Sequence, residues 1–374
     1  MTTTPFYRYD IGLLKRTLEV IRRQISSRPD FHVHYAIKAN ANPLILNPIL
    51  EAGLGIDCVS GGEIEAAIKA GFSPSSIVFA GVGKDDWEID LALENGIFCL
   101  NVESEAELDV LRERARIHGK RVRIAFRVNP DVDAHTHSNI TTGLAENKFG
   151  INLELLDDLI AHTITMSEIS LEGLHFHIGS QIVEMEPFHE LCQRINTLQK
   201  KLKSVGFTAR HINVGGGLGI DYKEPEKHPI PDFESYFNIF KTELELQPGQ
   251  EVHFELGRSI VAQCGQLVTK VLYVKENPGK RFAITDAGMT DLIRPALYDA
   301  YHKITNLSSN EEEQLYDVVG PICESSDTFG KNRKLSKVHR GDLLAIMSAG
   351  AYGETMASQY NLRRLPSSES FETH

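Results

Sequence analysis

Short apolar or β-branched segments alternate with longer amphipathic segments between residues 31 and 257. Segments such as 62–70 and 103–118 mix apolar and charged residues as surface helices do. The short segments are typical of buried parallel strands that are joined by crossover helices. We predict such strands at His32–Ile37, Gly55–Val59, Ile77–Ala80, Phe98–Val102, Val122–Val128, Leu171–His177, His211–Val214 and Val252–Leu256.

These eight strands and their helices occupy roughly 225 residues, which favours a (β/α)8 barrel of the usual ~250 residues. An open doubly wound sheet is the alternative interpretation. We therefore predict an α/β domain over residues 11–257, built as a (β/α)8 TIM barrel.

The pattern changes after residue 258, where strand-like segments are separated by turn-forming residues with little helix between them. These segments are Gln266–Lys275, Arg281–Asp286, Gln314–Cys323 and Gly341–Met347. We predict a second, all-β domain over residues 258–374, barrel-like or sandwich-like, to which residues 1–10 contribute a strand at Phe6–Tyr9. The polar segment 363–374 has no strand pattern and is predicted to be frayed.

Composition and charge narrow the class of partner. The 374 residues are 41% hydrophobic, which is enough for two cores, and the net charge of −12 disfavours nucleic acid. We expect a small-molecule substrate and no membrane partner, because no apolar segment reaches the ~18 residues that span a bilayer and no signal peptide is recognisable. Five scattered cysteines without CxxC spacing indicate no disulfide framework and favour the cytoplasm.

Barrel enzymes carry their reactive side chains at the carboxyl ends of the strands. The first predicted strand ends at Lys38, in the sequence YAIKAN. Burial disfavours the ammonium form, so we predict a pKa lowered toward that of a usable amine nucleophile, as in a Schiff-base lysine. The alternative is a lysine that merely extends its charged end into solvent.

Three neighbouring strand ends offer groups that bind phosphate. Gly215, Gly216 and Gly217 follow a strand and can expose backbone N–H groups, while Ser180 and Arg258 follow the strands on either side. Phosphate sites of barrels tend to lie on these last strands. The alternative is a tight turn, since the GxGxxG dinucleotide fingerprint is not matched.

Glu255 lies near the end of the last barrel strand, where it can meet the ring nitrogen of a pyridine cofactor whose phosphate lies on the glycine turn. An ion pair between Glu255 and Arg258 is the alternative. His177 shares a strand face with His175 by the period of two, so it is either a stacking imidazole or half of a core pair.

The pairs His32-x-His34 and His175-x-His177 resemble the zinc ligands of barrel metallohydrolases. His32 and His34 precede Lys38 by six and four residues. At ~3.3 Å per residue, this places them far from the carboxyl ends of the strands, where the catalytic side chains lie. We therefore interpret them as interior packing and not as metal ligands, and we predict no metal site.

Eight motifs taken together resemble those of the fold-type III pyridoxal-phosphate decarboxylases, the family of ornithine, arginine and diaminopimelate decarboxylases. The resemblance runs from about Pro5 to about Asn361. Segments 142–151, 285–302 and 323–331 are most similar to the family's diaminopimelate decarboxylases, which form L-lysine and CO2 from meso-2,6-diaminopimelate. The motifs are YAIKAN, DCVSGGEIE, FRVNPD, HFHIGSQ, NVGGGLGI, ELGRS, CESSD and GAYG.

The resemblance implies that pyridoxal 5'-phosphate is bound as a Schiff base to Lys38, with His177 stacked on its ring and Glu255 on its ring nitrogen. It also implies a head-to-tail homodimer in which Cys323 and Glu324, with Tyr352 as a further candidate, complete the partner's active site. Cys323 would deliver the proton to the product. The implied cofactor-binding residues are Lys38, Asp57, Arg127, His177, Ser180, Gly215, Gly216, Gly217, Glu255, Gly257, Arg258 and Tyr352.

Diaminopimelate carries a second amino-acid head, so its pocket needs a cation for the distal carboxylate and an anion for the distal ammonium. Arg294 and Glu324 are the candidates, and Arg258, Tyr298 and Tyr352 complete the expected pocket. The alternatives are an ornithine-, arginine- or carboxynorspermidine-type decarboxylase and a catalytically silent cofactor-binding regulator. Two departures from the family pattern are Leu256 in ELGR and Ser326 in CESSD.

Overall fold

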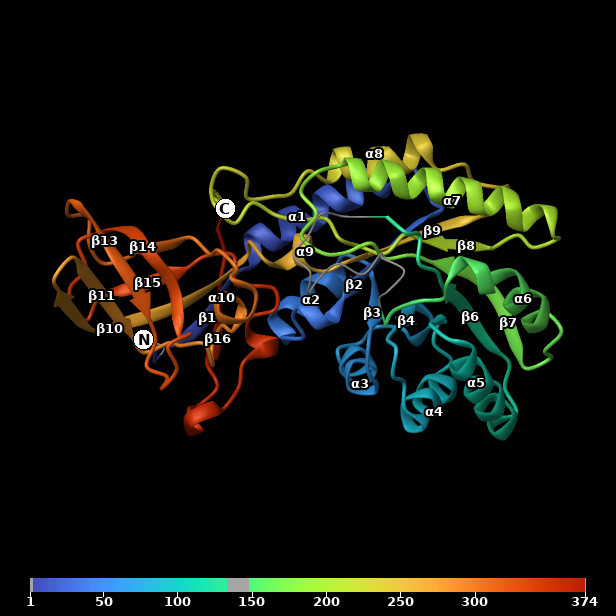
Figure 1. The fold of residues 1–374 in the computed structure, drawn as a ribbon, viewed down its shortest axis with the longest axis horizontal. Coiled ribbons are helices and arrows are strands. Elements are labelled where there is room, and N and C mark those ends of the chain that lie inside the picture. Colours follow the sequence, from blue (N-terminus) through green and yellow to red (C-terminus); the bar gives the residue numbers. More distant parts are fainter. Residues whose placement is uncertain (1–2, 133–147, 374) are drawn as a thin grey trace.

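The computed structural model describes residues 3–132 and 148–373, so only residues 148–151 of the segment 142–151 fall within it. Eight parallel strands form a closed barrel, with neighbours in chain order and the last strand paired with the first (Figure 1). The open doubly wound sheet is therefore wrong. The barrel strands are β2 (Phe31–Ala36), β3 (Gly55–Cys58), β4 (Ile77–Phe79), β5 (Cys99–Val102), β6 (Val122–Arg127), β7 (Ile169–His175), β8 (His211–Asn213) and β9 (Glu251–Leu256).

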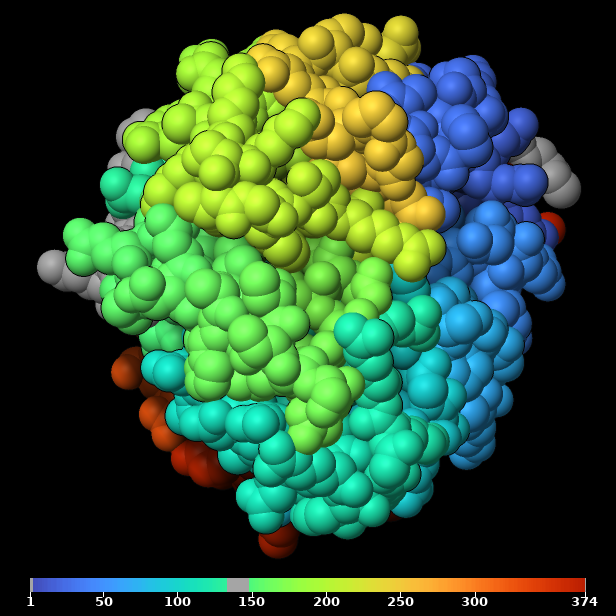
Figure 2. Space-filling view, turned by 90° about the vertical axis from the view of Figure 1, so that its right-hand side faces the viewer, coloured from blue at the N-terminus to red at the C-terminus, as the bar shows by residue number. Residues whose placement is uncertain are grey.

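Helices cover the outside of the barrel, and their ends follow from local sequence. Asp85 and Glu88 form a capping box before α4, while Ser104 caps α5 and Gly119 ends it in the left-handed conformation. Figure 2 shows successive chain segments following one another around the ring, from blue through green to gold. These helices are α1 (Ile11–Ile25), α2 (Pro43–Glu51), α3 (Gly61–Lys69), α4 (Asp86–Asn95), α5 (Glu105–His118), α6 (Leu153–Thr163), α7 (Glu186–Ser204) and α8 (Phe233–Glu243), with the 3-10 turns η1 (Ile37–Ala39) and η2 (Pro74–Ser76).

A mostly antiparallel sheet forms the second part of the molecule, in the strand order β12-β15-β10-β11-β13-β14 (Figure 1). The predicted N-terminal strand is present as β1 (Phe6–Asp10), which pairs antiparallel with β10. The other elements are α9 (Arg258–Val261), β10 (Gly265–Asn277), β11 (Lys280–Thr285), α10 (Arg294–Tyr298), β12 (Ile304–Asn306), β13 (Glu313–Val319), β14 (Thr328–Ser336), β15 (Leu343–Ile346), η3 (Glu354–Met356) and η4 (Tyr360–Leu362).

The prediction of a frayed C-terminus is wrong. Residues Ser367–Phe371 form β16, which pairs in parallel with β1. Its backbone pairs with β1 from Ser367 to Phe371, and the Arg8 guanidinium lies 4.1 Å from the centre of the Phe371 ring. Beyond the strand, the Thr373 amide donates a hydrogen bond to Asp10. An edge strand with one apolar side chain lacks the hydrophobic alternation that makes strands recognisable in a sequence.

The described part of the chain contains no helix that is both long enough and apolar enough to cross a membrane. We propose that the domain boundary lies at residues 257–258, since Leu256 ends the last barrel strand and the first sheet strand after the barrel begins at Gly265.

Imidazole rings fill the part of the barrel interior that is nearer to the amino-terminal ends of the strands. The ring centres of His34 and His211 lie 5.1 and 5.0 Å from that of His253, and Phe98 stacks on His253 at 5.1 Å. Burial lowers the pKa of both His34 and His211 to about 4 and holds that of His253 well below its usual value. All three rings are therefore neutral near pH 7.

Acid is expected to destabilise the fold between about pH 6.5 and pH 4 through these histidines. The unfolded chain binds a proton near the ordinary pKa of 6.5, whereas folded His34 and His211 resist protonation down to about 4. The stabilisation is complete above pH 6.5 and is lost as the pH falls toward 4. Each pKa unit corresponds to about 1.4 kcal/mol, so the loss should reach several kcal/mol. Urea denaturation in metal-free buffer at about pH 7.5 and about pH 5 measures this, and equal midpoints would contradict it.

Candidate active site

A pocket of about 210 Å³ lies at the carboxyl end of the barrel, and it brings together most of the predicted site residues. Their side chains come from different strand ends and from the sheet domain, which explains why they are far apart in the sequence. The lining residues are Ala36, Lys38, His177, Ser180, Gly217, Leu218, Glu255, Gly257, Arg258, Arg294, Tyr298, Tyr352 and Met356.

Lys38 lies in η1, directly after β2, and its Nζ is 3.0 Å from Oδ2 of Asp57. Its side chain retains 37% exposure, because it opens into the pocket. The predicted lowering of the lysine pKa is wrong. Burial alone lowers this pKa, but Asp57, Tyr352 and Glu255 together outweigh burial and raise it. An ion pair across two barrel strands determines the sign of the shift.

The segment around Lys38 is held rigidly by the sheet domain. Asn40 donates from Nδ2 to the Gly350 carbonyl, and the Tyr352 amide donates to the Ala39 carbonyl at 2.8 Å. The buried Tyr35 hydroxyl donates to the Asn40 carbonyl. These contacts fix the lysine's backbone from both sides, so its amine is presented to the pocket from a fixed point.

Asp57 is the last residue but one of β3 and is fully buried. Burial and the negative charge of Glu255 raise its pKa to about 7, and Lys38 offsets only part of that rise. Its Oδ1 has no hydrogen-bond partner among the described residues, whereas Oδ2 contacts Lys38. The carboxyl group is therefore able to hold or release a proton near neutral pH beside the lysine amine.

Glu255 is buried and accepts three hydrogen bonds. Asn213 donates at 2.7 Å, Asn101 at 3.2 Å, and His175 Nε2 lies 3.0 Å away. Burial opposes the anion, but His175 and Lys38 outweigh it and hold the pKa of Glu255 below its ordinary range. The carboxylate is consequently a fixed negative charge at the base of the pocket.

The alternative pairing of Glu255 with Arg258 is not what the structure shows. Arg258 donates instead to the Tyr222 hydroxyl at 2.7 Å and to the Ser180 hydroxyl at 3.0 Å. Sequence reasoning missed Asn101 and Tyr222 altogether. A polar Asn101 within the apolar segment 98–102 is a signal that could have identified the first of them.

His177 lines the pocket, while His175 points to Glu255, so the two do not form a core pair. The Gly216 amide donates to His177 Nδ1 at 3.4 Å. Burial and the positive charges of Arg127 and Lys38 lower the pKa of His177 to about 3. The ring is therefore neutral, as a flat stacking surface for a cofactor ring should be.

The glycine turn after β8 is sterically closed to larger residues. Gly215 and Gly217 have φ of 70° and 104°, and a Cβ on Gly216 would lie 1.9 Å from the Glu255 carbonyl oxygen. Only glycine fits this turn, which lies next to the Arg258 side chain in the pocket wall. Nε of Arg258 is buried and has no hydrogen-bond partner among the described residues.

Arg127, at the end of β6, is buried and pairs with Glu103 at 3.0 Å. Its guanidinium lies 4.7 Å from the centre of the Phe149 ring. Arg127 does not line the 210 Å³ pocket. Its described contacts, with Glu103 and Phe149, lie outside the pocket lining, so it supports the site indirectly.

Arg294 and Tyr298, from α10 of the sheet domain, form the outer wall of the pocket. The Arg294 guanidinium lies 5.3 Å from the Tyr222 ring centre and 5.9 Å from that of Tyr298, and its Nε donates to His302 at 3.3 Å. Burial lowers the pKa of Arg294 from its usual value. A cation held against aromatic faces suits a carboxylate ligand.

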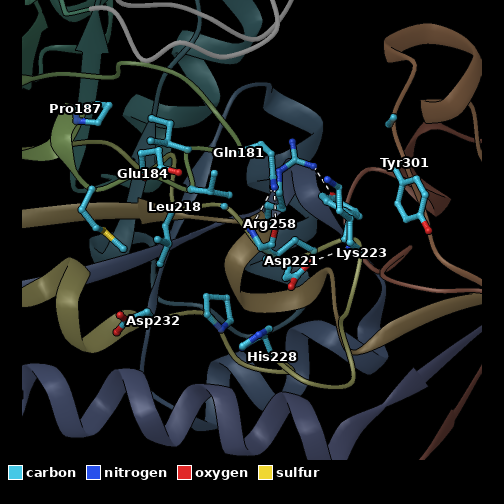
Figure 3. Close-up of a pocket in the computed structure, with 18 of the residues that line it drawn as sticks. Gln181, Glu184, Pro187, Leu218, Asp221, Lys223, His228, Asp232, Arg258 and Tyr301 are labelled. Atoms are coloured by element: carbon cyan, nitrogen blue, oxygen red, sulfur yellow. Dashed lines mark hydrogen bonds between the residues drawn. The ribbon is translucent and has the colours of Figure 1, made fainter.

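A larger groove of about 1070 Å³ continues outward from the pocket and shares Arg258, Arg294 and Tyr298 with it. Figure 3 shows Arg258 near its centre, with Gln181, Glu184 and Leu218 on barrel loops and Tyr301 on the opposite side. The groove gives a small molecule a route from solvent to Lys38.

Cys323 and Glu324 do not line the pocket of their own chain. Both are exposed on the loop after β13, where the Tyr360 hydroxyl donates to Glu324 at 2.9 Å. Ser326 has no left-handed backbone, and Asp327 holds the loop by accepting from the Ile322 amide, so the missing glycine is not required. Tyr352, by contrast, lines the pocket of its own chain. The suggestion that the partner subunit supplies Tyr352 is therefore corrected.

The chemistry of this donor set fits pyridoxal phosphate. A primary amine, a neutral imidazole face and a buried carboxylate match its aldehyde, ring and ring nitrogen. The glycine turn and the unpartnered Nε of Arg258 match its phosphate.

Comparisons with known proteins agree on one family. The family model described as "Pyridoxal-dependent decarboxylase, pyridoxal binding domain" matches residues 12–262. The diaminopimelate decarboxylase of Bacteroides thetaiotaomicron is 60% identical over 363 residues, which cover 97% of this chain and 94% of that protein. The crystal structure of diaminopimelate decarboxylase from Helicobacter pylori complexed with L-lysine has a TM-score of 0.94 at 41% identity and covers 100% of this chain and 92% of that one. The arginine decarboxylase of Paramecium bursaria Chlorella virus has a TM-score of 0.86 at 22% identity, covers 99% of this chain and 96% of that one, and shares the fold.

Proposed function

Since the chain belongs to the pyridoxal-dependent decarboxylase family, we propose that it converts meso-2,6-diaminopimelate to L-lysine and CO2 with pyridoxal 5'-phosphate as cofactor. The observation that carries the proposal is the convergence of Lys38, Glu255 and Arg294 on one pocket. Lys38 and Glu255 serve any decarboxylation in this family, whereas Arg294 is the cation that a substrate with a distal carboxylate requires.

Each residue of the site has a separate role in the proposed reaction. Arg258, Ser180 and the amides of Gly215–Gly217 would hold the phosphate, and His177 would support one face of the ring. Lys38 would hold the cofactor through its amine, and its Nζ is the group that can carry a proton beside the reacting centre. Glu255 stays anionic because His175 and Lys38 outweigh its burial, and Asn101 and Asn213 hold its carboxylate in place. Asp57 and Arg127 would complete the cofactor-binding set from outside the pocket lining. When bound, the cofactor supplies the electron sink for the pair of electrons that departing CO2 leaves behind.

We further propose a head-to-tail homodimer in which Cys323 and Glu324 of one subunit complete the pocket of the other. Support comes from their exposure on a loop outside the pocket of their own chain and from the wide groove that leads to Lys38. In this arrangement the Cys323 thiol donates a proton to the carbon that has lost CO2. Glu324 accepts a hydrogen bond from the distal ammonium, opposite Arg294.

Mixing two inactive variants tests the shared site. Lys38→Ala and Cys323→Ala remove groups that belong to different subunits of each proposed site, so a mixed dimer regains one intact site. Random reassociation should restore activity at about a quarter of the sites. Mixing each variant with itself under the same conditions is the control. Activity that stays at the level of the separate variants would place both groups in one chain.

Replacing Arg294 with glutamine should impair diaminopimelate much more than a substrate that lacks the distal carboxylate. A buried arginine–carboxylate contact is worth about 1.5–3 kcal/mol, so kcat/KM should fall roughly 10- to 150-fold, mostly through KM. Arg281→Gln, an exposed arginine of the same domain paired with Glu276, is the matched control. An equal fall for both substrates would contradict the specificity role.

The decisive experiment supplies the purified protein and pyridoxal phosphate with diaminopimelate, ornithine, lysine, arginine and carboxynorspermidine, and measures CO2 and amine product for each. We expect L-lysine from diaminopimelate to dominate. Preference for another substrate would make the protein a polyamine-type decarboxylase. Tight cofactor binding without turnover of any substrate would make it a regulator.

A further inference from the structure

Three side chains with metal-binding atoms converge at the amino-terminal end of the barrel, opposite Lys38. His32 lies on β2, while Glu251 and His253 share one face of β9. The strand register pairs His32 with His253, and one ligand atom from each of the three residues lies within 4.8 Å of the others. The cluster therefore spans the pairing of the first and last barrel strands.

Hydrogen bonds fix where the protons lie on the two buried histidines of this region. The Ser76 carbonyl can only accept, so His34 donates to it from Nδ1 at 3.2 Å. With its proton on Nδ1, the His34 ring accepts at Nε2 from His253 Nδ1 at 2.8 Å. Because its proton lies on Nδ1 in this hydrogen bond, His253 is left with a lone pair on its own Nε2.

That lone pair faces a carboxylate. Nε2 of His253 lies 3.6 Å from Oε2 of Glu251 and has no hydrogen-bond partner among the described residues, although His253 is only 3% exposed. Two electron-rich atoms at this separation repel one another unless a cation lies between them.

We propose that His32, Glu251 and His253 bind a zinc ion that joins β2 to β9. Two imidazoles and a carboxylate form a typical zinc ligand set, and tetrahedral ligands lie about 3.3 Å apart, close to the 3.6 Å between His253 and Glu251. His32 and Glu251 are half-buried, so their side chains can turn toward the ion, and solvent can reach it. His34 and Ser76 act behind His253, because they hold it in the tautomer that metal binding requires. This site is structural and separate from the chemistry at Lys38.

Calorimetric titration of the chelator-treated holoenzyme with ZnCl2 tests the proposal. We expect one site per chain in the wild type, and at least about tenfold weaker binding in Glu251→Gln and His32→Gln. Both positions are half-buried, so these variants should fold, and their metal-free melting temperatures check this. His339→Gln is the matched control, since it removes an exposed histidine paired with Glu311 at 2.7 Å. Zinc should raise the melting temperature of the wild type and of this control, but not of the other two variants.

Several results would overturn the inference. These are no stoichiometric zinc binding by the wild type, equal affinity in the wild type and Glu251→Gln, or zinc binding that is lost in Cys323→Ser. The last result would assign the ion to the exposed thiol. Because the titration does not involve turnover, a failure here is distinguishable from a failure of the proposed decarboxylation.

Discussion

Lys38→Ala is expected to reduce kcat by at least about a thousandfold, because the variant lacks the amine that binds the cofactor and carries a proton at the reacting centre. The visible absorbance of the bound cofactor should also change, and the cofactor should be lost on dialysis. Steady-state kinetics and absorbance spectra of the purified variant measure both effects.

Lys38→Arg removes the primary amine but keeps a positive charge at this position. The guanidinium can keep an ion pair with the buried Asp57, so the variant should retain the fold and the local electrostatics. It cannot form the same bond to an aldehyde, so activity should remain as low as in the alanine variant. Retention of more than about a tenth of wild-type kcat in Lys38→Arg would exclude the assigned role.

The barrel, and the end of it at which the site lies, were predictable from the sequence because both depend on short-range patterns. Apolar segments of the correct length recur at the spacing of βα units, and parallel strands bring their carboxyl ends to one edge. Lys38, His177 and Glu255 therefore had to lie near one another once the barrel was assumed. The family resemblance, carried by the same strand ends, is confirmed by the match over residues 12–262.

Features that depend on contacts across the barrel were not predictable. The raised pKa of Lys38 depends on Asp57 at 3.0 Å, on a neighbouring strand. The anionic state of Glu255 depends above all on His175, 80 positions away in the sequence. Composition and periodicity describe one segment at a time, so neither reveals the sign of an interaction between two segments.

The strand β16 was missed for a related reason. Its residues are mostly polar, and its partner β1 lies at the other end of the chain. Tyr352 shows the same limit, because the sequence could not decide which subunit's pocket it enters. Its amide hydrogen bond to Ala39, close to Lys38, connects it to the pocket of its own chain.

Glu255→Gln should lower kcat by roughly 100- to 1000-fold with little change in KM, because it removes a preorganised charge and little volume. A carboxylate at this position stabilises positive charge on the cofactor's ring nitrogen, and a neutral amide does so far less. The substitution should be tolerated structurally. Its oxygen can still accept from Asn101 and Asn213, as the Glu255 oxygen does at 3.2 and 2.7 Å.

The new amide would face His175, whose Nδ1 has no hydrogen-bond partner among the described residues. His175 can therefore move its proton to Nδ1 and accept from the amide, so the pocket keeps its hydrogen bonds while losing one charge. Glu243→Gln is the matched control, because it changes a glutamate–histidine pair with a 2.6 Å contact outside the pocket. The variant should retain the cofactor and the wild-type urea midpoint. If it also kept wild-type kcat, the fixed negative charge beneath the pocket would have no part in the reaction.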